Sequence, residues 1–130
     1  VYIEIETNGT LVLDLTLCQR LNQINVSPKL DNSGESRAKA RVPKVLSQLS
    51  ALDKAHFKFV VSEPANVNEI LEHYVGPYDI PSSRVWLMPE GGTREQLQAK
   101  QAWVVEQCKT HFFRYSPRLQ VAIWDEVTGV

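Results

Sequence analysis

The sequence alternates between segments typical of β-strands and segments typical of amphipathic helices, and this order constrains the fold more than any other feature. Strand patterns, marked by alternating or β-branched apolar residues, cover 1–7, 24–27, 56–62, 84–88 and 118–124. Helical spacing of apolar residues covers 42–52, 66–75 and 93–110. Strands joined by helices are typical of parallel sheets with right-handed crossovers. The sequence therefore predicts an α/β fold.

Capping residues set the expected ends of these helices. Pro43 suits the first turn of a helix, because its missing amide hydrogen leaves no donor unpaired there. Asn66 is expected to cap the next helix and Gly76-Pro77 to end it. Thr93, with Gln96 three residues later, matches a capping box before the last helix.

Two stretches give weaker signals. Residues 11–22 are apolar but have no clear period, so no element is predicted there. Residues 31–39 are polar and lack an apolar anchor. We expect this second stretch to be a loop and the most mobile part of the chain.

The chain has 130 residues, which fits one domain or a piece of one. A closed barrel of eight strand–helix units needs about 250 residues. We therefore expect residues 1–130 to form part of a single domain, either a partial (incomplete) β/α barrel of parallel strands or a small open sheet. The chain begins at Val1 and runs directly into a strand pattern, so we also expect a missing segment upstream.

Charge and apolar content limit the classes of function. With 14 Lys and Arg against 15 Asp and Glu, the net charge of −1 offers no basic field for a nucleic-acid backbone. Apolar runs stay shorter than the roughly 18–20 residues of a membrane span. We therefore expect a cytoplasmic protein that acts on a small molecule, with no direct nucleic-acid partner and no membrane partner.

Ligands bind parallel sheets at the carboxyl ends of the strands, where loops converge. In this sequence the rule selects the segments 6–10, 27–29, 63–64 and 88–92. Ser27 and Lys29 flank a proline that fixes the backbone, so a hydroxyl and an ammonium group could hold a carboxylate or phosphate together. Asn8 brings an amide to the first segment, and Glu90 brings a carboxylate to the last.

Each of these segments also has a purely structural interpretation. The segment around Asn8 is typical of a turn closed by the Asn side chain, and Lys29 of a solvated lysine at a strand end. Gly91-Gly92 is typical of a connection before a helix. On spacing alone, the structural interpretation is the more common one for the first two segments and about as common as a ligand site for the last.

Metal and nucleophile motifs are absent from the sequence. Cys18 and Cys108 lack CxxC spacing, and the histidines His56, His73 and His111 are scattered. GxSxG, P-loop, HExxH and complete GxGxxG motifs do not occur. The residues alone therefore assign no metal ligand and no catalytic residue.

An ordered set of motifs makes the prediction more specific. The segments IETNGT, VSPKL, KFVVSE, VWLMPEG and RLQVAIW follow one another, and the chain ends at Thr128-Gly129-Val130. In this order, and with this terminus, they resemble the C-terminal part of the 7-carboxy-7-deazaguanine synthases. The similarity covers essentially the whole chain.

The resemblance implies the C-terminal portion of a radical S-adenosylmethionine (SAM) fold, which is a partial β/α barrel and commonly a homodimer. It implies a lyase of queuosine biosynthesis that converts 6-carboxy-5,6,7,8-tetrahydropterin to 7-carboxy-7-deazaguanine with loss of ammonia. The implied cofactors are SAM, a 4Fe–4S cluster and Mg²⁺, and the implied partner is the small-molecule pterin substrate.

The resemblance also implies ligand contacts, position by position. The implied SAM contacts are Asn8, Ser27, Pro28, Lys29, Met88, Pro89, Glu90 and Gly91. The implied pterin contacts are Gln120 and the carboxylate of Val130. The cluster-binding cysteines and the magnesium-binding hydroxyl would lie upstream of Val1, so we expect this chain alone to be inactive. Two alternatives stay open: another radical SAM activating or maturation enzyme, or a noncatalytic fragment that binds an adenosyl or pterin ligand.

Overall fold

A computed structural model describes residues 1–33 and 41–117. Within these residues, parallel strands form a single sheet in the order β1-β2-β3-β4-β5. The strands are β1 (Glu4–Thr7), β2 (Gln23–Val26), β3 (Ala55–Val61), β4 (Val85–Pro89) and β5 (Arg114–Tyr115). The α/β class with parallel strands is confirmed. The partial barrel stays a prediction.

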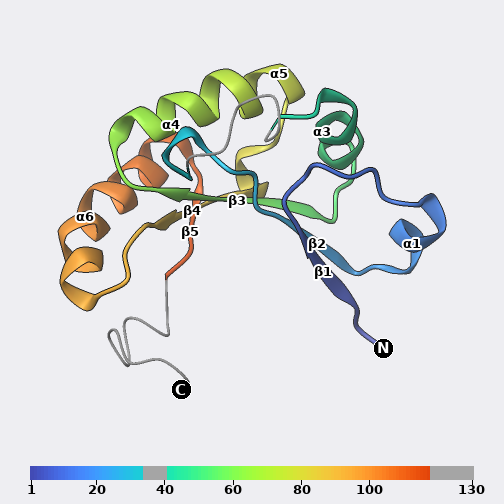
Figure 1. The fold of residues 1–130 in the computed structure, drawn as a ribbon, viewed down its shortest axis with the longest axis horizontal. Helices are drawn as coiled ribbons and strands as arrows, with labels where there is room; N and C mark the ends of the chain where they lie inside the picture. Colours follow the sequence, from blue (N-terminus) through green and yellow to red (C-terminus); the bar gives the residue numbers. More distant parts are fainter. Residues whose placement is uncertain (34–40, 118–130) are drawn as a thin grey trace.

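Helices connect the successive strands, and α3, α4, α5 and α6 lie along one side of the sheet (Figure 1). The helices are α1 (Leu15–Arg20), α3 (Pro43–Ser50), α4 (Pro64–Ile70), α5 (Gly76–Tyr78) and α6 (Arg94–His111). Shorter turns are the 3₁₀ turns η1 (Asp31–Ser33) and η3 (Ser82–Arg84) and the π-helical turn η2 (Leu71–Val75). Across residues 1–33 and 41–117, we find no helix with the length and apolar character that crossing a membrane requires.

The two faces of the sheet differ in polarity. Along β3, Phe57 and Phe59 are fully buried, whereas Lys58 between them is half-buried, and β2 and β4 alternate in the same way. The buried face packs against the helices in one hydrophobic core, whose largest fully buried side chains include Tyr74, Phe57, Phe59, Ile24, Leu46, Leu49 and Ile70. The opposite face, hereafter the polar face, carries Glu4, Glu6, Gln23, Asn25, His56, Lys58 and Trp86.

Helix α1 lies within the stretch where the sequence predicts no element. It is short, and capping holds it at both ends. The carboxylate of Asp14 accepts hydrogen bonds from the Thr16 and Leu17 amides, and Lys54 Nζ donates to the carbonyls of Cys18 and Leu21 at 2.7 and 2.8 Å. A distant lysine leaves no local signal, so periodicity misses this helix.

The expected cap of the following helix is wrong by one turn. Asn66 is not the N-cap of α4, because the N-cap is Glu63 and Pro64 is the first helical residue. Asn66 instead occupies the third helical position, and its Oδ1 accepts hydrogen bonds from the amides of Ser62 and Glu63. Pro64 favours this earlier start because its ring already has the helical φ.

Gly76-Pro77 does not end the helix, contrary to the sequence prediction. The π-helical turn η2 precedes the pair, and the Gly76 amide donates to the carbonyl of Leu71. A Cβ on residue 76 would lie 3.0 Å from that same carbonyl oxygen, so glycine permits the close turn. Helix continues through α5 and stops at Asp79, which has a left-handed backbone with φ 49°.

Other boundaries match the sequence closely. Pro43 is the first residue of α3, and Thr93 with Gln96 forms the capping box of α6. The first strand starts at Glu4 rather than Val1, and residues 1–3 are exposed. The strand predicted over 118–124 lies outside the described residues. So do 34–39 of the predicted loop, while η1 occupies the start of that loop. The two-residue strand β5 is too short to give an alternating pattern and was not predicted.

Candidate functional site

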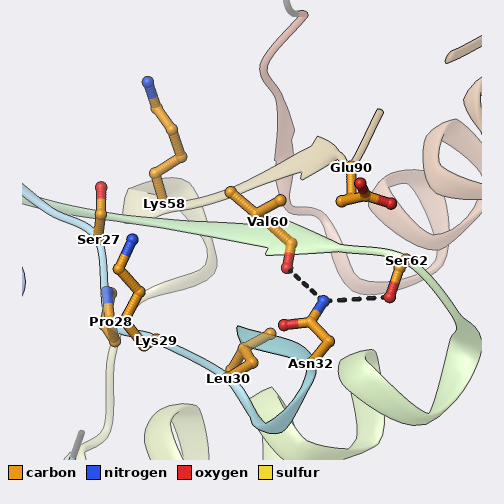
Figure 2. A pocket seen from close by; sticks show the side chains of 9 residues that line it. All are labelled: Ser27, Pro28, Lys29, Leu30, Asn32, Lys58, Val60, Ser62 and Glu90. Atoms are coloured by element: carbon orange, nitrogen blue, oxygen red, sulfur yellow. Dashed lines mark hydrogen bonds between the residues drawn. The ribbon is translucent and has the colours of Figure 1, made fainter. Parts of the chain in front are cut away.

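A cleft of about 420 Å³ lies at the carboxyl edge of β2, β3 and β4 (Figure 2). Its lining residues are Ser27, Pro28, Lys29, Leu30, Asn32, Lys58, Val60, Ser62 and Glu90. The loops that follow β2 and β4 therefore meet at one edge of the sheet, as the rule for parallel strands predicts. Clefts of this volume are typical of small-molecule sites.

Backbone pairing beyond the strand ends positions two of the predicted residues. The Ser27 amide donates to the carbonyl of Thr7 at 2.8 Å, so the chain after β2 stays beside β1. The Glu90 amide donates to the carbonyl of Val61, also at 2.8 Å, so the chain after β4 stays beside β3. These bonds hold Ser27 and Glu90 at the rim of the cleft.

Asn32 fastens the loop after β2 to β3. Its Nδ2 donates to the carbonyl of Val60 at 3.3 Å and to Ser62 Oγ at 3.1 Å, as Figure 2 shows. A third interaction joins Nδ2 to Asn66 Oδ1 at 3.3 Å. Asn66 is only 3% exposed, and its Oδ1 also accepts from the Ser62 and Glu63 amides at 2.9 and 3.1 Å. One buried amide thus organises the end of β3 and, through Asn32, one wall of the cleft.

A buried ion pair between Arg41 and Glu69 also stabilises the loop after β2. Glu69 is 8% exposed and accepts a hydrogen bond from Arg41 Nη2 at 2.7 Å, and both of its oxygens accept from the Asp31 amide at 3.2 Å. The Arg41 guanidinium also lies 5.6 Å from the centre of the Tyr74 ring. Burial raises the pKa of Tyr74, and the nearby Arg41 acts in the opposite direction. Both ends of the 31–41 segment are therefore tied to α4.

The cleft is lined by one carboxylate, Glu90, and two lysines, Lys29 and Lys58. Lys100 Nζ donates to Glu90 Oε2 at 2.6 Å and to the Glu90 carbonyl at 3.0 Å, so this carboxylate is held against α6. Lys29 and Lys58 supply two ammonium groups to the lining. Ammonium groups and hydroxyls that line the same cleft suit a carboxylate or phosphate.

Asn8 lies beside the cleft in a neighbouring hollow lined by Glu6, Thr7, Asn8, Ser27 and Lys29. The Asn8 Oδ1 accepts from the amide and the hydroxyl of Thr10, at 3.2 and 2.7 Å. The turn interpretation of this segment is therefore confirmed. Gly9 has φ 80°, which explains the glycine at this position.

A second hollow, of about 240 Å³, lies on the polar face. It is lined by Glu4, Glu6, Gln23, Asn25, His56, Lys58, Trp86 and Ser116. Trp86 Nε1 donates a hydrogen bond to His56 Nδ1 at 3.0 Å. Lys58 lines both this hollow and the cleft, so the two adjoin along β3.

Within residues 1–33 and 41–117, His, Cys, Asp and Glu side chains do not gather in groups of three or more that could hold a metal ion. Cys18 and Cys108 are both buried free thiols. Burial raises the pKa of Cys108 to about 11, because the thiolate would lose its hydration.

Comparison with known proteins finds relatives over nearly the whole chain. The 7-carboxy-7-deazaguanine synthase of Pyrobaculum aerophilum is 34% identical over 128 residues, which cover 98% of this chain and 54% of the relative. The Halobacterium salinarum synthase is 31% identical, covering 94% of this chain and 54% of the relative. The Rhodopirellula baltica synthase is 28% identical, covering 92% of this chain and 49% of the relative. The chain resembles the 7-carboxy-7-deazaguanine synthases.

The chain spans about half the length of these synthases, which is consistent with a C-terminal part. No protein-family profile matches the chain, and no solved structure matches it. The resemblance to the synthases that the motifs indicate is thus confirmed.

The residues implied by the synthase motifs separate into two groups in the structure. Asn8, Ser27, Pro28, Lys29 and Glu90 line the cleft or its neighbouring hollow. Met88, Pro89 and Gly91 do not line them. Gln120 and Val130 lie outside the described residues. For every one of these residues, binding to SAM or to the pterin stays a prediction.

The positions of Pro89 and Gly91 explain why they are absent from the lining. Pro89 is buried on the helix-covered face of β4. Gly91 is buried too, and a Cβ there would lie 3.1 Å from both Gln96 Cβ and Leu97 Cδ2. Glycine at 91 therefore lets the loop pack closely against the start of α6.

Sequence reasoning missed part of the lining, namely Leu30, Asn32, Lys58, Val60 and Ser62. The alternation of β3 could have found Lys58, because it falls on the opposite face from Phe57 and Phe59. Asn32 gives no such signal, since it lies in a polar loop whose path depends on distant partners.

Proposed function

We propose that the protein containing this chain is a 7-carboxy-7-deazaguanine synthase, and that the chain supplies the SAM side of its active site. In this proposal the enzyme is a radical SAM lyase that rearranges 6-carboxy-5,6,7,8-tetrahydropterin to 7-carboxy-7-deazaguanine with release of ammonia. The observation that carries the proposal is the similarity to three synthases over at least 92% of this chain.

The cleft supports the proposal through its chemistry. SAM has a carboxylate, an amino group and two ribose hydroxyls, so its site needs a cation together with neutral donors and acceptors. Lys29 and Lys58 supply ammonium groups, and Ser27, Ser62 and Asn32 supply hydroxyls and an amide. This donor set fits the amino-acid end of SAM. We propose that Lys29 holds the carboxylate and that Ser27 orients it.

The polar face supports the same assignment. Parallel sheets are usually covered on both faces, either by helices or by closure into a barrel. Here the polar face, which no helix covers within residues 1–33 and 41–117, carries carboxylates, amides, a histidine and a lysine that remain half-buried or exposed. We propose that this face lines the interior of a partial β/α barrel and holds the pterin beside SAM.

The iron–sulfur cluster and Mg²⁺ are assigned to the remainder of the protein. Described residues of this chain offer no group of three or more ligands for either. When bound, the cluster and SAM would supply the radical that starts the rearrangement. Within this chain, residues of the cleft bind and orient SAM, and the apolar core behind the sheet keeps them fixed. We further propose that the full-length enzyme is a homodimer.

Product formation by the full-length protein tests the proposal. The protein is reconstituted anaerobically with iron and sulfide and then given SAM, Mg²⁺, a reductant and 6-carboxy-5,6,7,8-tetrahydropterin. We expect a product with the mass of 7-carboxy-7-deazaguanine and the release of ammonia, both dependent on SAM. SAM cleavage without any deazapurine would contradict the substrate assignment and favour another radical SAM enzyme. Absence of SAM cleavage by a protein with an intact cluster would contradict the enzyme class.

A further inference from the structure

The His56–Trp86 pair on the polar face has one defined donor and one defined acceptor. An indole nitrogen is only a donor, and Trp86 Nε1 lies 3.0 Å from His56 Nδ1. His56 Nδ1 must therefore accept, which leaves the proton of the neutral imidazole on Nε2. The two rings are tilted by 59° with their centres 6.1 Å apart, so the contact is a hydrogen bond at the ring edges rather than stacking.

The surroundings of the pair favour this neutral form. Burial lowers the pKa of His56, and the positive charges of Arg84 and Arg114 lower it further. Arg114 lies 5.4 Å from the Trp86 ring centre and donates through Nε to the carbonyl of Ser83 at 2.8 Å. The Trp86 ring thus contacts a guanidinium over its face and the imidazole at its Nε1 edge. The other charged groups lining this hollow are Glu4 and Glu6 on β1 and Lys58 on β3.

Nε2 of His56 has no acceptor within hydrogen-bond distance among residues 1–33 and 41–117. His56 lines the hollow of the polar face, together with Lys58, Gln23 and Asn25. The imidazole ring is held by its hydrogen bond with Trp86, and its Nε2–H has no acceptor in the described part of the chain. This N–H therefore suits an acceptor atom on a bound small molecule.

We propose that Trp86 is a positioning residue that fixes His56 as the Nε2–H tautomer, and that His56 donates this hydrogen to an acceptor atom of the substrate. The acceptor is a carbonyl or carboxylate oxygen or an imine nitrogen. The second half rests on the proposed function, because it takes the carboxypterin as the substrate. The first half concerns the protein alone, so each half has its own measurement.

The tautomer is measured by NMR on the full-length protein with ¹⁵N-labelled histidine, before iron and sulfide are added. The His56 signal is assigned as the one that disappears in His56→Gln. We expect a proton bonded to Nε2 and an unprotonated Nδ1. In Trp86→Phe, which keeps an aromatic ring but removes the donor, we expect both tautomers. Trp103→Phe is the matched control, because Trp103 packs against the core from α6, and it should leave the signal unchanged. A proton on Nδ1 in the wild type overturns the proposal.

Kinetics with the carboxypterin test the contact with substrate. Glutamine can place its amide nitrogen near the position of imidazole Nε2, whereas asparagine can only reach that of Nδ1. We expect KM to rise roughly fivefold to tenfold in His56→Asn, the loss expected for one hydrogen bond, with kcat changed less than about twofold. His56→Gln should restore most of the affinity. Equal KM values for wild type and His56→Asn overturn the contact. If the wild type forms no deazapurine at all, the proposed function and the substrate contact fail together, and the NMR result still decides the tautomer.

Discussion

Replacing Asn66 with leucine removes the acceptor on which the end of β3 depends. Asn66 Oδ1 accepts from the amides of Ser62 and Glu63, at 2.9 and 3.1 Å, and from Ser62 Oγ at 3.1 Å. It also receives Asn32 Nδ2, which links it to the wall of the cleft. Leucine has a similar size and a good helical propensity, so the change isolates the hydrogen bonds.

The expected loss follows from the two backbone amides. A buried amide without a partner costs about 1–3 kcal/mol, and these two are partly rather than fully buried. We therefore expect Asn66→Leu to lower the free energy of unfolding by about 2–3 kcal/mol. Asn66→Asp keeps an oxygen acceptor near the start of a helix, so its loss should stay below about 1 kcal/mol.

Urea denaturation of the full-length protein, followed by circular dichroism, measures both variants against the wild type. The reasoning requires aspartate to be clearly less harmful than leucine. A loss below about 1 kcal/mol for Asn66→Leu, or equal losses for the two variants, would show that Oδ1 does not organise this edge.

Three further predictions concern packing, the buried thiol and pH. Gly91→Ala should destabilise the protein by about 1–2 kcal/mol in thermal unfolding, because the new Cβ would lie 3.1 Å from Gln96 and Leu97. The control Gly92→Ala should have little effect, and equal effects of the two variants would contradict the prediction. Cys108 should react with iodoacetamide about 100-fold more slowly than a free thiol, because its pKa is raised to about 11. Peptide mass spectrometry measures the labelling, and rapid labelling of Cys108 in the folded protein would contradict the prediction. The folded-state pKa of His56 lies below 6.5, so the unfolded chain binds more protons between the two values and stability should rise with pH across that window. Urea denaturation should show a smaller rise in His56→Gln, and an identical slope would contradict the assignment.

Local patterns predicted the parts of the fold that local chemistry determines. The alternation of β3, Pro43 at the start of α3 and the Thr93–Gln96 capping box all depend on neighbours in sequence. The strand-end rule likewise placed Ser27 and Glu90 at one edge, because parallel strands bring their carboxyl ends together.

Features that depend on distant partners were missed or placed wrongly. Helix α1 ends on Lys54, which comes from beyond α3. The helix continues past Gly76-Pro77 because a π-helical turn precedes the pair, and no capping rule describes the hydrogen bond of that turn. Asn32 is held at the cleft by Val60, Ser62 and Asn66, which follow it by 28, 30 and 34 positions. The sequence was enough to identify the loops of the site, whereas the side chains that hold these loops in place could be identified only from the structure.

Equilibrium binding of SAM to the full-length protein tests the central claim, that the edge formed by the loops after β2 and β4 holds this cofactor. Affinities are compared for the wild type, Lys29→Met and the control Lys109→Met, which removes an exposed lysine on α6 that pairs only with Glu106 among the described residues. We expect Lys29→Met to raise the Kd at least about tenfold, because a charged hydrogen bond contributes about 1.5–3 kcal/mol, and Lys109→Met to leave it unchanged. Equal affinity in Lys29→Met and the wild type would contradict the claim.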